Sequence, residues 1–256
     1  MATNPTFVFI PGAWHQPSCY DIARDDLASR GYESEYVSLP TVGAQPPNKG
    51  LADDVASARA VLQRLADEGK QIVLGVHSYG SLVGANAVQG LGYRQRAQEG
   101  KKGGVVMFVY ISAFVNSKGV SILNQLGDAW LPWMAPSELV GDLGKEAGNV
   151  TILDPETIMY HDVEPELQKK AVSDLKHQSS PVFSGIVTNE PWHEVDCAYF
   201  FCEEDKALPI QVQEMMSGLL PESTLKFRFQ TSHSPFLSKP KEFADALVKV
   251  AKASQE

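Results

Sequence analysis

One segment constrains the fold of this chain more than any other: an apolar run that ends in a serine flanked by small residues. The run from Gln71 to Gly75 leads into Val76-His77-Ser78-Tyr79-Gly80, and a small-residue helix is expected over 81–87. This order predicts a nucleophile elbow, a sharp strand-to-helix turn that lifts the serine hydroxyl into a cleft. Gly80 and Gly84 would let the helix pass close to its strand. An activated serine attacks acyl carbons, so the segment indicates acyl transfer.

The elbow is not decisive by itself. The usual pattern has glycine two positions before the serine, where this chain has Val76. A buried serine in an ordinary strand-to-helix turn is the alternative interpretation. Other segments must therefore supply the remaining parts of an acyl-transfer site.

The first of these segments is a turn near the N-terminus. An apolar strand over 7–10 ends in Pro11-Gly12-Ala13-Trp14-His15. Acyl transfer needs two backbone N–H groups aimed at the developing oxyanion. We expect Tyr79, just after the serine, to supply one N–H group and Ala13 to supply the other.

The second segment carries a candidate general base. His233 lies in Thr231-Ser232-His233-Ser234-Pro235-Phe236, after an apolar alternation over 225–229 and before a helix expected over 240–252. A lone histidine is more often a surface or helix-capping residue. A histidine on a loop after a late strand, however, is typical of a base that follows the nucleophile and the acid in chain order.

The acid must lie between serine and histidine. The segment 196–202 is predicted to be a strand, and Glu203, Glu204 and Asp205 follow it. Asp205 is favoured because Pro209 can open the next helix, which leaves Asp205 in the loop at the carboxyl edge of the sheet. Glu204 is the alternate acid, and the alternative interpretation is that both residues are solvated loop charges. The strand expected over 104–114 contains no acidic residue, which removes the common alternative location.

Together these segments resemble the α/β-hydrolases, and most closely the small esterases that include plant methylesterases, hydroxynitrile lyases and pyrethroid-hydrolase-like enzymes. The Pro-Gly-Ala-Trp-His turn, the His-Ser-Tyr-Gly elbow, the Asp-Lys-Ala-Leu-Pro segment and the His-Ser-Pro-Phe loop carry the resemblance. It implies a catalytic triad of Ser78, Asp205 and His233 with an oxyanion hole at Ala13 and Tyr79. The implied fold is a mostly parallel sheet flanked by helices, with a helical lid inserted after the sixth strand.

A comparison within this group favours hydrolysis. The hydroxynitrile lyases carry a lysine directly after the histidine and a threonine in the first turn, where this chain has Ser234 and Gly12. Without the lysine charge, nothing obvious stabilises a departing cyanide. We therefore expect a small-molecule ester or lactone as substrate. A lyase, cyclase or dehydratase on the same site, or a ligand receptor with slow turnover, are the alternatives.

The rest of the chain is organised around an insertion. Strand and helix patterns alternate over 1–114 and 196–256, as in a mostly parallel sheet, and we expect these to form one α/β-hydrolase core. Residues 115–195 break the alternation and are expected to form the lid. Trp130, Trp133 and Trp192 lie in this lid segment and Trp14 lies in the first turn. Lined by these rings, the site would favour an apolar or aromatic acyl group. The alternative interpretation is that the rings pack the lid against the core.

Composition limits the other function classes. With 43% hydrophobic and 21% charged residues, the 256-residue chain is typical of a soluble globular domain. We expect a monomer or a homodimer, although the sequence does not fix the oligomeric state. The net charge of −9 argues against nucleic-acid and anionic-membrane partners. Cys19, Cys197 and Cys202 lack metal-ligand spacing and suggest free thiols in a reducing compartment. Because Met1 to Pro5 show no leader pattern, we expect a cytoplasmic protein.

The other histidines give no sign of a metal or cofactor site. His77, beside the candidate nucleophile, is interpreted as structural, and His15 as lining the pocket or capping its loop. His161 and His193 lie in the expected lid without a second histidine at ligand spacing, so no metal is expected. No Gly-x-Gly-x-x-Gly follows the first strand, so no dinucleotide cofactor is expected either.

Overall fold

The sheet at the centre of the molecule consists of six parallel strands. The computed structural model describes residues 4–137 and 148–255. The strand order across the sheet is β2-β1-β3-β4-β8-β9, and every neighbouring pair is parallel. The strands are β1 (Thr6–Ile10), β2 (Ser34–Tyr36), β3 (Gln71–His77), β4 (Gly104–Ile111), β8 (Asp196–Cys202) and β9 (Leu225–Phe229).

Burial explains why these segments form strands of different kinds. Strands β1, β3, β4 and β8 are almost continuously apolar and buried on both faces, as central strands of a parallel sheet must be. At one edge, β9 alternates instead: Lys226 and Arg228 are exposed, whereas Phe229 is buried. The expected mostly parallel sheet is confirmed.

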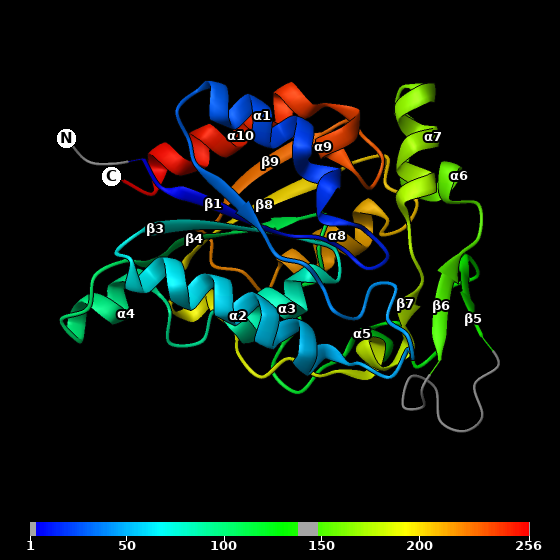
Figure 1. Cartoon of the computed structure of the whole chain (residues 1–256), viewed down its shortest axis with the longest axis horizontal. Coiled ribbons are helices and arrows are strands. Elements are labelled where there is room, and N and C mark those ends of the chain that lie inside the picture. Colours follow the sequence, from blue (N-terminus) through cyan, green and yellow to red (C-terminus); the bar gives the residue numbers. More distant parts are fainter. Residues whose placement is uncertain (1–3, 138–147, 256) are drawn as a thin grey trace.

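Helices cover both faces of the sheet (Figure 1). Helices α1 (Asp21–Ser29) and α10 (Pro240–Ala253) pack together on one face, and α2 (Leu51–Asp67) and α3 (Gly80–Ala87) on the other. The shorter helices outside the insertion are η1 (Pro17–Tyr20), α4 (Tyr93–Gln98), α8 (Ile210–Ser217) and α9 (Pro235–Ser238).

Residues 115–195 come between β4 and β8 in the chain, and their described part up to residue 184 lies beside the carboxyl ends of the strands (Figure 1). Two expectations are corrected here. The insertion follows the fourth strand in chain order, because β1 to β4 of the central sheet precede it and β8 and β9 come after it. It is also mixed rather than helical, because β5, β6 and β7 form an antiparallel sheet. Its elements are α5 (Ile122–Gln125), β5 (Met134–Pro136), β6 (Asn149–Ile152), α6 (Pro155–Met159), α7 (Pro165–Asp174), β7 (Gln178–Ser179), η2 (Ser180–Ser184) and η3 (Pro191–His193).

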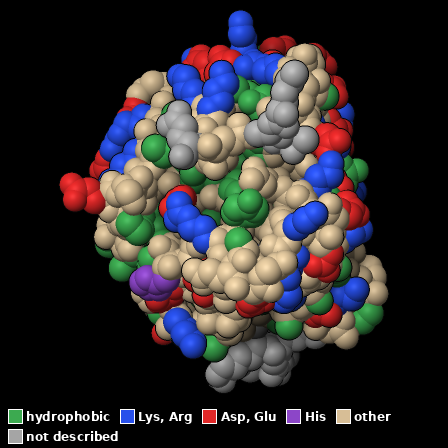
Figure 2. All heavy atoms as spheres, turned by 90° about the vertical axis from the view of Figure 1, so that its left-hand side faces the viewer, with side chains coloured by type: hydrophobic (Ala, Val, Ile, Leu, Met, Phe, Trp, Pro, Cys, Tyr) green, Lys and Arg blue, Asp and Glu red, His purple; other side chains and the backbone are tan. Residues whose placement is uncertain are grey.

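The face away from the insertion carries both termini and α4. Lys and Arg side chains are interspersed there with Asp and Glu (Figure 2). Among the described residues, no helix combines the length and the apolar character needed to cross a bilayer.

Candidate active site

The candidate nucleophile occupies a strained turn. Ser78 follows β3 directly, has φ 50°, and its backbone N–H donates to the Ile111 carbonyl on the neighbouring strand at 3.2 Å. Positive φ is unfavourable for a serine, so the surrounding packing must impose it. Close packing is evident next to it: a Cβ on Gly80 would lie 2.5 Å from the Pro11 carbonyl oxygen. A glycine here is therefore required for the elbow to sit against the first turn.

His233 and Asp205 form a buried pair. Nδ1 of His233 lies 2.6 Å from Oδ2 of Asp205. The other oxygen of Asp205, Oδ1, accepts from the backbone N–H groups of Ala207 and Leu208 at 2.7 and 2.8 Å. These amides fix the carboxylate, which in turn fixes the imidazole. Since Nδ1 is engaged, Nε2 is the nitrogen left for the serine.

The alternate acid is placed elsewhere. Glu204 is exposed, and its backbone carbonyl accepts from Nε2 of His161 at 2.9 Å. Asp205 is 6% exposed and is the carboxylate that meets the imidazole.

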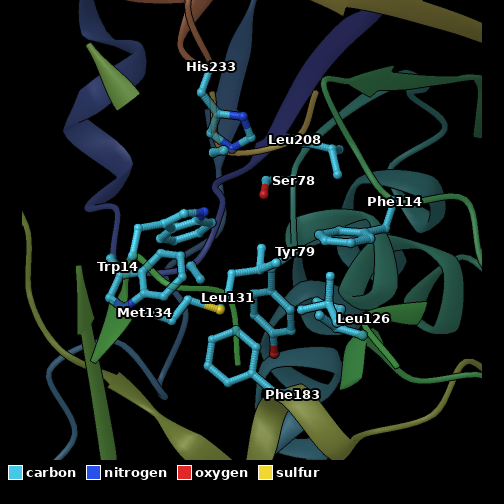
Figure 3. Close-up of a pocket in the computed structure, with 14 residues that line it drawn as sticks. Trp14, Ser78, Tyr79, Phe114, Leu126, Leu131, Met134, Phe183, Leu208 and His233 are labelled. Carbon is cyan, nitrogen blue, oxygen red and sulfur yellow. The ribbon is translucent and has the colours of Figure 1, made fainter. Parts of the chain in front are cut away.

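Ser78 and His233 come together in one pocket. The imidazole points down onto the serine hydroxyl (Figure 3), and both residues line the same cavity. They approach it from β3 and from the loop after β9, which lie at the same carboxyl edge of the sheet.

Two backbone N–H groups are available for an oxyanion. Ala13 and Tyr79 line the pocket, and neither donates its backbone N–H to an acceptor in the described part of the chain. The next amide along the first turn is engaged: Trp14, at φ 66°, donates its N–H to Oε1 of Gln178 at 3.2 Å. The arrangement leaves the two N–H groups that the sequence suggested free to bind a ligand.

Sequence reasoning missed one residue of this cluster. The Ser112 hydroxyl, at the end of β4, donates to Oδ2 of Asp205 and lies 3.4 Å from Nδ1 of His233. Ser112 has φ 38° and is fully buried. Its place directly after a central strand, where an acid was sought and not found, was the available signal.

His77 and His15 support the site from behind. Nε2 of His77 donates to the His233 carbonyl at 2.9 Å. His15 donates from Nδ1 to the Ala13 carbonyl at 2.8 Å, and its Nε2 accepts from the Tyr160 hydroxyl at 2.9 Å. Burial lowers the pKa of His15 to about 4 and holds the pKa of His77 well below its usual range. Both rings are therefore neutral supports at pH 7.

The pocket is apolar and small. It is lined by Ala13, Trp14, Ser78, Tyr79, Phe114, Ile122, Leu126, Leu131, Trp133, Met134, Phe183, Ala207, Leu208 and His233. Its cavity volume is about 20 Å³. That holds roughly one water molecule, whereas small-molecule sites measure about 300–1,000 Å³. The free space beside the serine is therefore narrow.

The four tryptophans that were expected at the site are divided. Trp14 and Trp133 line the pocket with their ring centroids 5.7 Å apart. Trp130 packs edge-on behind Phe183 at 5.1 Å. The expectation that Trp192 lines the site is wrong, because Trp192 lies with residues of α4 at the amino end of β8. A residue that closely precedes a parallel strand lies at the edge opposite the site.

No metal centre is found within the described ranges, where no three His, Cys, Asp or Glu side chains gather as ligands would.

A profile of the alpha/beta hydrolase family matches residues 7–246. The chain belongs to the alpha/beta hydrolase family. This confirms the resemblance and the fold drawn from the four motifs. The chain is 30% identical over 240 residues to the alpha/beta hydrolase nvfD of Aspergillus novofumigatus (strain IBT 16806), covering 93% of this chain and 92% of the relative.

Solved structures of the same fold include an esterase and a synthase. Polyneuridine aldehyde esterase superposes with a TM-score of 0.77 at 18% identity, covering 97% of this hydrolase and 99% of that chain. Tomato methylketone synthase I, complexed with 2-tridecanone, superposes with a TM-score of 0.79 at 16% identity, covering 99% and 100%. At these identities the likeness shows the fold alone.

Proposed function

We propose that this alpha/beta hydrolase is a serine hydrolase that cleaves a small-to-medium apolar or aromatic carboxylic ester or lactone through an acyl-enzyme. The observation that carries the proposal is the buried Asp205–His233 pair, whose imidazole faces Ser78 in an apolar pocket. Families of this fold host several chemistries, so the site and not the fold supports the assignment.

The reaction proceeds in two acyl-transfer steps. His233 Nε2 removes the Ser78 hydroxyl proton as Oγ attacks the carbonyl carbon, and the backbone N–H groups of Ala13 and Tyr79 hold the oxyanion. Collapse of the intermediate expels the alcohol, which takes the proton from His233. Water, deprotonated by the same imidazole, then adds to the acyl-enzyme and releases the acid and Ser78.

The pocket lining supports an apolar substrate. Trp14, Trp133, Met134 and Phe183 surround the serine, and a charged acyl group would lose its hydration there without a compensating partner. Because the cavity holds only about 20 Å³, substrate entry requires side chains from the insertion to move aside. Trp133 and Met134 adjoin or belong to β5, so a shift of that short strand would open the site.

The test is covalent labelling. A fluorophosphonate reacts appreciably only with a serine activated by its neighbours. We expect peptide mass spectrometry to locate the label at Ser78, and His233→Ala to abolish it. Ser78→Ala should keep the fold while lowering ester turnover by several orders of magnitude, about 10⁶-fold at most.

Product analysis separates the other chemistries. Hydrolysis in H₂¹⁸O would place one labelled oxygen in the acid product. A lyase, cyclase or dehydratase would leave the product unlabelled, and a receptor would be stabilised by its ligand without turnover. If Ser78 stays unlabelled in the folded protein, the proposal is overturned.

A further inference from the structure

A buried carboxylate lies beneath the candidate oxyanion hole. Asp54, in the first turns of α2, is fully buried. Its Oδ2 accepts from the Tyr79 hydroxyl at 2.6 Å and from the Thr41 hydroxyl at 2.6 Å, and its Oδ1 accepts from the Thr41 backbone N–H at 3.1 Å. Tyr79 is the residue whose N–H group is available at the serine. Its ring extends away from Ser78 (Figure 3), and its hydroxyl meets this carboxylate.

The same network reaches the other side of the hole. Nε2 of Gln178, on β7 of the insertion, donates to the Thr41 hydroxyl at 2.6 Å. Oε1 of that amide accepts the Trp14 backbone N–H at 3.2 Å. Trp14 directly follows Ala13, so the positions of both candidate oxyanion donors are tied to Asp54, one directly and one through Thr41 and Gln178.

Burying this carboxylate lowers the stability of the fold, which indicates that Asp54 has a role beyond packing. In the described part of the chain Asp54 has three hydrogen-bond donors and no ion-pair partner. Burial raises the pKa of Asp54 to about 6 despite those bonds. A buried carboxylate without a cation destabilises the fold, and a neutral residue of the same size would serve better if only packing were needed.

We propose that Asp54 is a positioning residue for the oxyanion hole. It holds the backbone N–H of Tyr79 in place through the Tyr79 hydroxyl. It also holds the turn at Ala13 and Trp14 in place, through Thr41 and Gln178. The inference rests on the proposed function. Because the oxyanion forms only during reaction, such a residue acts on kcat and leaves KM unchanged. A residue that only clamps α2 to the loop before it would affect stability alone.

A double-mutant cycle tests this. Asp54→Asn keeps the volume but turns an acceptor into a donor toward Thr41 or Tyr79, and Tyr79→Phe removes the hydroxyl while retaining the backbone N–H. We expect each variant to lower kcat and the fluorophosphonate reaction rate by about tenfold with KM unchanged. The double variant should be no slower than Asp54→Asn, because both changes cut the same link.

The labelling end point separates misfolding from mispositioning. Full stoichiometry at Ser78 with a slower rate shows that the variant is folded but mispositioned. Arg96→Met is the control: it removes the hydrogen bonds to the Gly103 and Lys102 carbonyls and the ion pair with Asp67 at the far end of α2, so it should lower Tm without changing kcat.

Three outcomes would overturn the inference. Two of them concern the variants: folded Asp54→Asn reacting as fast as the wild type, or a double variant whose loss of rate is the product of the two single losses. Either would show that Asp54 does not act through Tyr79. The proposed function would still stand, provided that the wild-type protein is labelled at Ser78. Failure of the wild type itself to label would overturn the proposed function, and this inference with it.

Discussion

Nε2 of His77 lies 2.9 Å from the backbone carbonyl oxygen of His233, so the residue before the candidate nucleophile holds the loop of the candidate base. The two rings lie 4.5 Å apart between centroids, and Phe236 packs edge-on against His77. His77, interpreted as structural from the sequence, thus links the two halves of the site.

Replacing this imidazole should damage both stability and activity. His77→Phe keeps an aromatic ring but leaves the His233 carbonyl without its donor, which should cost about 1–3 kcal/mol of unfolding free energy. The loosened loop should lower kcat by about tenfold. Urea unfolding and ester hydrolysis measure the two effects, and His193→Ala, an exposed change in η3, is the control. Unchanged stability in His77→Phe would show that the bond contributes nothing.

The acid assignment can be decided by two neighbouring substitutions. Asp205→Asn removes the acceptor for Nδ1 of His233 and should lower kcat by about 10⁴-fold, the loss seen when a triad aspartate can no longer fix the imidazole tautomer. Glu204→Gln, one residue away and exposed, should change kcat less than about twofold. The reverse ranking in steady-state hydrolysis would transfer the role to Glu204.

Trp133 should limit the size of the acyl group. Its ring and that of Trp14 lie on the pocket wall, so Trp133→Ala should raise kcat/KM for bulky relative to short acyl esters by about tenfold. Trp192→Ala should leave this ratio unchanged, because Trp192 lies at the opposite edge of the sheet. A series of p-nitrophenyl esters of increasing acyl size measures both, and equal shifts in the two variants would contradict the placement.

Stability should fall in mild acid because of His15. Its pKa drops from the ordinary 6.5 to about 4 on burial. Below pH 6.5 the unfolded chain binds a proton at His15 that the folded chain binds only near pH 4. The contribution of neutral His15 to the free energy of unfolding is therefore fully present above pH 6.5 and is lost as the pH falls through 4. The slope is about 1.4 kcal/mol per pH unit.

Asp54 works in the opposite direction, since its raised pKa of about 6 favours the folded chain as the pH falls. Urea unfolding at pH 7, 6 and 5 should therefore show a gentler decline than His15 and His77 alone would give. His15→Phe should reduce the slope of unfolding free energy against pH by the amount that one titrating group contributes. Parallel curves for the wild type and His15→Phe would show that His15 does not titrate as described.

Much of the site was predictable because the chemistry follows the ends of strands. Ser78, Asp205 and the His233 loop each follow the carboxyl end of a strand of the sheet within a few residues, and parallel strands present their carboxyl ends on one side. The same rule, applied strictly, would have excluded Trp192, because that residue precedes β8 rather than following it.

What the sequence determined by itself is therefore the alternation of strands and helices in the core, the elbow at Ser78 and the candidates that follow the strands, since each depends on local apolar patterning and turn chemistry. Only the tertiary structure decided which carboxylate meets the imidazole, that Ser112 and His77 brace the pair, and that Asp54 reaches Tyr79 from another helix. Those contacts join segments far apart in the chain, and buried hydrogen bonds between such segments leave no periodic signal in either one.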